Sequence, residues 1–440
     1  TPGELPIMAT QPFDSALSSA VGRAGTAYRL GRRKLFSRKI PLKSMRADLL
    51  LSRIALLPAG LVFAVLLLPT VQDRFFGAGL RWLYVLTLSF LASYLLTPLF
   101  KRLAIVLNIL DQPGGRKVHA AATPLLGGAA VFAAFLIAIL ANGMVSGKLI
   151  VILAAAAMLF LMGVVDDVRE LTARWKMLLQ LICTVAVIAA GVVLKVIPEG
   201  FGTAAWLGNF VLTLLWIVGI TNALNFFDGM DGLAAGLGAI IGIFLGITAF
   251  QTDQPFLGWV AVAMVGSCSG FLPHNFRVNG SAAIFLGDSG STFIGFTLAC
   301  IAVYGDWSDS SPLVAMASPL LIFWVLIFDM VHITVDRFNS GKVVNFHQWL
   351  EYTGKDHLHH RLAHVLGSNR RSVLFIYLMS GCFGMSSLLL RNARPIEAVV
   401  LLFQAVILVV LVTILERRGR SLEPAVSMRS KSASAPSAKK

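Results

Sequence analysis

The sequence IVILAAAAMLFLMGVV, residues 150–165, carries no charged side chain along its whole length. A membrane hydrocarbon core about 30 Å thick is crossed by about 20 apolar residues in an α-helix. A membrane β-strand would alternate apolar and polar residues over about ten positions, whereas this stretch is apolar on every side. The segment therefore predicts a membrane-spanning helix.

The rest of the chain repeats this pattern. Of its 440 residues 57% are hydrophobic and 13% charged, against about 45–50% and about 25% in globular proteins. This balance excludes a soluble enzyme and a single-pass receptor. The predicted fold class is all-α, a polytopic helical membrane protein with about 11–12 transmembrane helices, near 54–70, 82–100, 125–141, 149–165, 177–197, 207–223, 233–250, 256–272, 289–304, 313–335, 373–390 and 396–415.

The basic residues predict the orientation. The formal net charge is +15, which in a membrane protein indicates positive charge on the cytoplasmic side rather than a nucleic-acid partner. With both termini inside, 31 of the 37 Lys and Arg residues lie on the cytoplasmic side. Both termini, and the loops on their side, are expected to face the cytoplasm.

Three regions follow from the composition. Residues 1–53 form a basic cytoplasmic leader without the apolar core of a signal peptide, and residues 1–7, ahead of Met8, are interpreted as a remnant of expression. Residues 54–415 form the integral membrane domain. Residues 416–440 have the Ser, Ala, Pro and Lys bias of a disordered cytoplasmic tail.

Polar residues are concentrated in five loops on the predicted inner side. Ionisable residues at the ends of apolar helices are costly, so their clustering on one face predicts a functional site. The five loops are DQPGGRKVH (111–119), VVDDVREL (164–171), TNALNFFDGMDGL (221–233), HNFRVNGSAAIFLGDSGS (274–291) and NFHQWLEYTGKDHLHHRL (345–362).

The carboxylate pair Asp166 and Asp167 ends one predicted span. One interpretation is structural, because Asp is a common residue at a helix start and caps it. The other is chemical, since two adjacent carboxylates can hold a divalent cation or accept a proton.

Four polar residues recur at every third position after the span at 207–223, namely Asn222, Asn225, Asp228 and Asp231. On an α-helix this spacing drifts by about 60° per step, which places the first and last on opposite faces. If all four serve one pocket, the helix must tighten or break, and Gly229 and Gly232 permit this. The alternative is an amide-rich packing seam between helices.

Asp288 lies in the glycine-flanked stretch GDSGS, residues 287–291, at the start of another span. One interpretation is structural, a helix N-cap. The same position leaves a carboxylate oxygen for a cation, and the glycines let a phosphate approach the backbone.

The last loop carries a dense group of cationic side chains, His357, His359, His360 and Arg361. Zinc is the weaker interpretation, because no cysteine accompanies them. Imidazole and guanidinium groups suit pyrophosphate oxygens or a sugar ring.

A similar anion-binding loop contains Arg116, Lys117 and His119, for which ordinary positive-inside charge is the alternative. Together the loops indicate a phosphorylated or pyrophosphorylated substrate at the membrane surface, with one or more Mg²⁺ ions.

These loops, taken in order from about residue 82 to about 415, resemble those of the polyprenyl-phosphate N-acetylhexosamine-1-phosphate transferases, which include the phospho-MurNAc-pentapeptide translocase. The matching patterns are D-x-P-x-x-R-K-x-H at 111–119, the pair at 166–167, N-x-x-N-x-x-D-G-x-D-G-L at 222–233 and G-D-S-G-S at 287–291. The sequence H-L-H-H-R-L at 357–362 is similar to the branch that transfers GlcNAc-1-phosphate. Gly354 and Ser281 depart from that branch, which usually has Asp and Pro there.

The resemblance implies transfer of GlcNAc-1-phosphate from UDP-GlcNAc to undecaprenyl phosphate in the bacterial inner (cytoplasmic) membrane, with release of UMP. Another UDP-N-acetylhexosamine or UDP-MurNAc-pentapeptide is the alternative donor, and a homodimer is left open. It implies Mg²⁺, with Mn²⁺ as an alternative, on Asn225 and Asp288. Asp166 would accept a proton from the lipid phosphate or orient it, supported by Asp167, while Asp228 and Asp231 would position metal, nucleotide or loop. Substrate-binding roles fall to Arg116, Lys117, His119, Asn222, His357, His359, His360 and Arg361.

Two other classes of protein are alternatives to this enzyme. A transporter of an anionic metabolite would need polar residues along a path near mid-bilayer, whereas these gather at one face. A scaffold with a dead site predicts lost carboxylates, and every matched carboxylate is present.

Overall fold

The computed structural model describes residues 56–112, 122–278, 280–308, 311–345, 348, 349, 352, 354, 356–390 and 393–433, the last 17 by their backbone alone. The chain divides into two units, 1–58 and 59–440, and the site and the helices described below belong to the second, except that the first helix begins in the last three residues of the first unit. The predicted leader 1–53 lies outside the described residues. So do Arg116, Lys117 and His119 in the first of the five loops.

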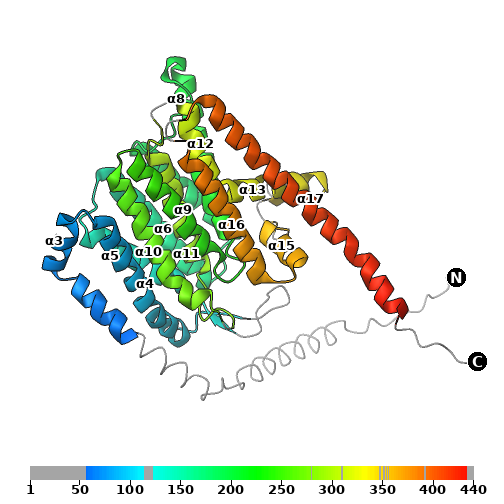
Figure 1. Cartoon of the computed structure of the whole chain (residues 1–440), viewed down its shortest axis with the longest axis horizontal. Coiled ribbons are helices and arrows are strands. Elements are labelled where there is room, and N and C mark those ends of the chain that lie inside the picture. The colour runs from blue at the N-terminus through cyan, green and yellow to red at the C-terminus, as the bar shows by residue number, and fades with distance from the viewer. Residues whose placement is uncertain are drawn as a thin grey trace, which may run out of the picture. The chain divides into compact units, whose positions relative to one another are not determined.

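The described chain is helical, and the predicted all-α membrane fold is confirmed (Figure 1). A helix at Leu56–Leu66 comes first. It is followed by α3 (Pro69–Gly77), α4 (Arg81–Val106), α5 (Gly127–Ala141), α6 (Gly147–Val168), α7 (Ala173–Ala189), a 3₁₀ turn at Glu199–Phe201, α8 (Thr203–Phe226), α9 (Leu233–Gln251), α10 (Pro255–Asn275), α11 (Gly287–Tyr304), α12 (Pro312–Ile322), α13 (Trp324–Asn339), α15 (Leu358–Leu366), α16 (Asn369–Leu388) and α17 (Pro395–Ala433).

Seven of the described helices are long and apolar enough to cross a membrane, or up to nine if each of two bent pairs forms one span. Two of the predicted spans, 54–70 and 313–335, contain a break that the sequence prediction does not include. Helix Leu56–Leu66 turns by 74° into α3, and α12 turns by 80° into α13. Pro69 has no N–H to continue the first helix, and Pro319 weakens the turn before the second break.

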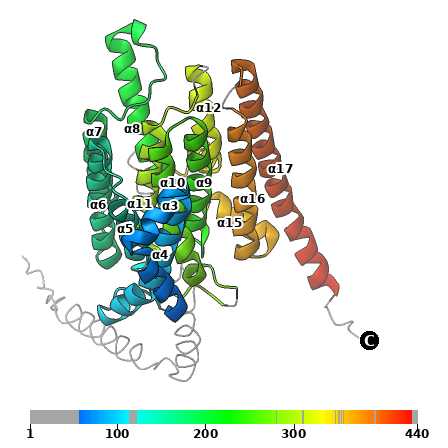
Figure 2. The ribbon, with the colours of Figure 1, turned by 60° about the vertical axis from the view of Figure 1, so that its left-hand side comes forward.

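Helix α11 lies at the centre of the bundle, in contact with α5, α6, α8 and α9. Figure 2 shows these helices side by side, with α6 and α7 at one edge and α16 and α17 at the other. Gly163 of α6 lies so close to α11 that a Cβ there would meet Ser289 Cα at 2.3 Å. This close approach places the end of α6, with its two aspartates, beside the start of α11.

A short antiparallel ladder closes the loop after α4. Strand β1 (Leu110–Asp111) pairs with β2 (Thr123–Pro124), with Leu110 opposite Pro124. Phe285 N–H donates to Pro124 O at 2.8 Å, which attaches the ladder to the segment before α11. Helix α17 continues to Ala433, so its backbone is helical well into the stretch for which the composition predicts a disordered tail.

Candidate active site

A cavity of about 1100 Å³ opens where several helix ends meet. Its wall combines the end of α6, the turn between α8 and α9, the start of α11 and the start of α15. Nine of the predicted site residues line it, namely Asp166, Asp167, Asn225, Asp228, Asp231, Asp288, His357, His359 and His360. Four of the five predicted loops therefore meet at one place. Asp111, which begins the remaining loop, and Leu125, which follows it in the sequence, also line the cavity.

Asp167 caps helix α11 from outside. Its Oδ1 accepts from the backbone N–H of Asp288 at 2.9 Å, and its Oδ2 accepts from the Ser289 hydroxyl at 2.8 Å. Gly287 makes this contact possible, because its φ of +77° suits glycine and a Cβ would lie 2.6 Å from Asp167 Oδ2. Capping, which the sequence offered as the alternative role of Asp288, is thus performed by Asp167.

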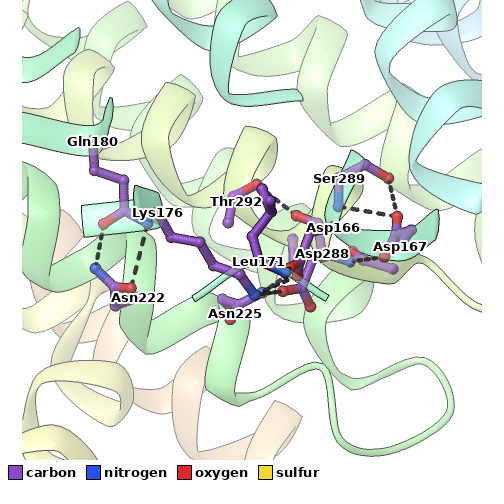
Figure 3. A network of polar contacts seen from close by, with 12 residues as sticks. Asp166, Asp167, Leu171, Lys176, Gln180, Asn222, Asn225, Asp288, Ser289 and Thr292 are labelled. Carbon is purple, nitrogen blue, oxygen red and sulfur yellow. Dashed lines mark hydrogen bonds and ion pairs between the residues drawn. The ribbon is translucent and has the colours of Figure 1, made fainter. Parts of the chain in front are cut away.

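Asp288 and Asp166 share one lysine. Lys176 Nζ, on α7, contacts Asp288 Oδ2 at 2.8 Å and also contacts Asp166 Oδ2 (Figure 3). The other oxygen of Asp166 accepts from the Leu171 N–H at 2.7 Å, which fixes the turn between α6 and α7. Two carboxylates that are 122 residues apart in the sequence are therefore held together at the cavity by a single ammonium group.

The asparagine and aspartate series divides at the end of α8. The helix ends at Phe226 and α9 begins at Leu233, after Gly232 with a φ of +82°. Asn225 Nδ2 donates to Ser291 Oγ at 2.9 Å, and Asp231 Oδ2 accepts from the Ala282 N–H at 2.8 Å. The predicted break is present, and it brings three members of the series to the cavity.

Asn222 is the member that does not line the cavity. Its Nδ2 donates to Gln180 Oε1 at 2.6 Å and to Val218 O at 2.8 Å, so it joins α8 to α7 (Figure 3). Asn222 therefore belongs to a packing contact between helices, which is the alternative that the sequence left open. Its predicted contact with substrate is not what the geometry favours.

Asp228 is a carboxylate of this turn whose charged form is disfavoured. Burial, followed by the nearby charges of Asp288 and Asp167, raises its pKa well above the ordinary value of a carboxyl group. A cation in the cavity would offset both effects.

Helix α15 presents the histidines. His359 is buried beside the turn after α8, where a Cβ on Gly229 would lie 2.7 Å from its Nε2. Burial, and then the neighbouring His360, His357 and Arg361, lower the pKa of His359 well below the ordinary value. Its ring stacks at 5.8 Å on that of His357, and the ring of His360 lies 4.2 Å away.

Arg361 lies behind the cavity rather than in its wall. Its guanidinium is 3.8 Å from Asp329 Oδ1 and 3.5 Å from Glu416 Oε2, and both carboxylates are buried. The sequence expectation that Arg361 contacts phosphate directly is not supported by this position.

Sequence reasoning missed two residues that organise the site. Lys176 counted only as an inner basic residue, since nothing in its spacing links it to Asp288. Asp329 pairs with His357 at 2.9 Å, a partner 28 residues away that its place in the sequence does not indicate. A buried carboxylate inside an apolar segment is itself the signal that could have drawn attention to it.

The cavity suits Mg²⁺ by the chemistry of its donors. Within the described ranges no group of three His, Cys, Asp or Glu side chains is arranged as a metal site. Mg²⁺ differs from zinc in this respect, because it keeps several waters and takes one or two carboxylates together with substrate phosphates. Asp288 and Asn225 supply a carboxylate and an amide at the cavity wall, which fits that coordination.

The comparisons with known proteins agree with the motifs. Residues 149–306 match the family model "Glycosyl transferase family 4". A Bacillus subtilis (strain 168) protein named probable undecaprenyl-phosphate N-acetylglucosaminyl 1-phosphate transferase is 33% identical over 71% of this chain and 86% of its own length. A Mycobacterium leprae (strain TN) decaprenyl-phosphate N-acetylglucosaminephosphotransferase is 35% identical over 75% of this chain and 89% of its own length.

A more distant relative covers the same region. The Escherichia coli (strain K12) undecaprenyl-phosphate alpha-N-acetylglucosaminyl 1-phosphate transferase is 27% identical over 67% of this chain and 81% of its own length. With its apolar helices and its carboxylate-lined cavity, the chain belongs to the membrane-embedded family of polyprenyl-phosphate N-acetylhexosamine-1-phosphate transferases.

Proposed function

We propose that this protein transfers GlcNAc-1-phosphate from UDP-GlcNAc to undecaprenyl phosphate and releases UMP. The observation that carries the proposal is that Asp166 and Asp288 both contact Lys176, in a cavity that the histidines at the start of α15 also line. The names of the relatives support the sugar and the polyprenyl acceptor.

The reaction joins two anions. An oxygen of the lipid phosphate attacks the phosphorus that bears the sugar, the bond between that phosphorus and the bridging oxygen breaks, and UMP leaves with the bridging oxygen. Repulsion between the lipid phosphate and the pyrophosphate is the main barrier, so cationic groups fixed in advance supply most of the catalysis. Lys176 is such a group, and Asp166 orients the lipid phosphate and takes its proton when it carries one.

Asp288 and Asn225 hold Mg²⁺ in this proposal, with Asp228 close by. Mg²⁺ held by these residues would supply positive charge against the pyrophosphate oxygens. His357, His359 and His360 lie across the same cavity and contact the phosphate and sugar of the donor. The cytoplasm supplies nucleotide sugars, so the cavity faces the cytoplasm, in agreement with the distribution of basic residues.

The test is release of UMP by the purified protein in detergent with undecaprenyl phosphate, Mg²⁺ and a panel of UDP-sugars. UDP-GlcNAc is expected to be the best donor, and omission of the lipid or addition of EDTA is expected to stop the reaction. A preference for UDP-MurNAc-pentapeptide or another UDP-N-acetylhexosamine would keep the reaction class and overturn the sugar. UMP release that does not depend on the lipid would overturn the transfer itself.

A further inference from the structure

Asp329 contacts the start of α15 at two points. The residue lies on α13 with an exposed fraction of 0%, and its Oδ2 is 2.9 Å from His357 Nδ1. Its Oδ1 accepts from the backbone N–H of Leu358 at 2.7 Å. One carboxylate therefore fixes both the ring of His357 and the first turn of α15.

Burial of this carboxylate costs free energy of hydration. A buried ion pair loses its hydration, and replacement by apolar residues is often neutral or stabilising. Here Arg361 and the buried Glu416 of α17 extend the network by ion pairs of 3.8 Å and 3.5 Å. Because a buried ionic network adds little net free energy of folding, we assign to it the orientation of the groups that it holds.

The geometry points to Asp329 as a positioning residue that keeps the proton of His357 on Nδ1 and leaves Nε2 to the cavity. This inference rests on the proposed function, because it assigns a use to the ring that the cavity presents. A carboxylate only accepts hydrogen bonds, so the ring nitrogen that faces it must donate. His357 belongs to the cavity wall, and Nε2 is then the nitrogen that meets a substrate phosphate oxygen.

The substitution Asp329→Asn separates orientation from folding. The new amide oxygen keeps the bond from the Leu358 N–H, because a backbone N–H can only donate. The amide NH₂ then faces His357 Nδ1 and donates to it, which moves the ring proton to Nε2. The size, packing and backbone contact of the residue are retained while the tautomer of His357 is reversed. The ion pair of Asp329 with Arg361 is lost, but Arg361 keeps its ion pair with Glu416 at 3.5 Å.

The first measurement is spectroscopic and needs no substrate. In ¹⁵N-histidine-labelled protein, with the His357 signal assigned by its loss in His357→Gln, Nδ1 is expected to be protonated in the wild type and unprotonated in Asp329→Asn. The spectra are recorded at about pH 8.5, about two units above the ordinary histidine pKa. An Nδ1 that is unprotonated in the wild type, or protonated in both proteins, would overturn the inference.

The second measurement is kinetic. Asp329→Asn is expected to lower kcat by about 10- to 100-fold, the range found when the partner that orients a site histidine is lost, and to change KM for UDP-GlcNAc less than about threefold. In a His357→Ala background, the same substitution should cause no further loss, because its effect passes through that ring. Equal losses in both backgrounds would contradict the positioning role.

Ser372→Ala is the matched control. The Ser372 hydroxyl donates to His359 O at 2.9 Å, so this variant also removes a buried bond to α15 but leaves the His357 ring untouched. It is expected to retain kcat. A loss as large as that of Asp329→Asn would show that any loosening of α15 is sufficient, which would overturn the inference. A wild type that releases no UMP from any donor would refute the proposed function, while the ¹⁵N result would still decide the role of Asp329.

Discussion

Asp167 and Asp288 are joined through the backbone rather than through their charges, since Asp167 Oδ1 accepts from the Asp288 N–H at 2.9 Å. The first carboxylate is thereby used in holding the start of α11. The second is left to face Lys176 and the cavity. The two aspartates are thus expected to respond differently to substitution.

Asp288→Ala is expected to reduce UMP release at least about 100-fold while the protein still elutes as a folded species from a sizing column. Its carboxylate contacts Lys176 at the cavity, whereas the start of α11 is held by Asp167, so the helix keeps its cap in this variant. Retention of more than about a tenth of wild-type activity at saturating Mg²⁺ would remove Asp288 from the metal site.

Asp167→Ala is expected to lower the free energy of unfolding by about 0.5–2 kcal/mol, the cost of losing a helix cap. Unfolding in mixed micelles measures this. Ser146→Ala is the matched control, because Ser146 caps α6 by accepting from the Leu149 N–H at 3.2 Å, outside the cavity lining. Both variants should lose stability, and only Asp167→Ala should also lose kcat. A loss of kcat in Ser146→Ala would mean that stability alone explains the effect.

Lys176→Met is expected to lower kcat at least about tenfold, equivalent to about 1.4 kcal/mol of transition-state stabilisation. The same change removes a positive charge that contacts Asp166 and Asp288, so divalent cations should bind more tightly, at least about threefold. Titration with Mn²⁺, followed by electron paramagnetic resonance, measures this without turnover. Weaker Mn²⁺ binding in the variant would show that the lysine helps to build the cation site rather than competing with the ion.

Asn222→Ala and Asn225→Ala are expected to differ, although the residues occupy equivalent places in one repeating pattern. Asn222→Ala breaks the amide pair with Gln180 and should lower the melting temperature with less than about a twofold change in KM for UDP-GlcNAc. Asn225→Ala should instead raise the Mg²⁺ concentration needed for half-maximal activity. A large rise of KM in Asn222→Ala would restore the substrate contact that the sequence pattern suggests.

The orientation is tested by labelling Ser281→Cys, an exposed residue of the cavity wall, in a Cys382→Ser background, since the other three cysteines are buried. An impermeant maleimide should label this cysteine only in inverted membrane vesicles. Thr203→Cys, exposed at the start of α8, should be labelled in intact cells instead. The reverse pattern would place the cavity on the outer face and exclude a cytoplasmic nucleotide sugar.

Most of the helices could be predicted from the sequence, because apolar runs in a membrane have few alternatives. The bends at Pro69 and after Pro319 could not, since hydropathy reports length and not direction. The carboxylates were found as a group because charges at the ends of apolar helices stand out. Lys176, Asp329 and the division between Asn222 and Asn225 depend on which helix faces which, and that is decided by tertiary packing.

Asp329 lies on α13, beyond the 80° break between α12 and α13. It is six positions after Phe323, the residue at the break, which corresponds to about 9 Å of helix. A swing of about 10° would carry its carboxylate about 1.6 Å, more than a hydrogen bond tolerates. The orientation of His357 in the cavity therefore depends on how firmly the packing of α13 against α8 and α16 fixes the angle at Phe323.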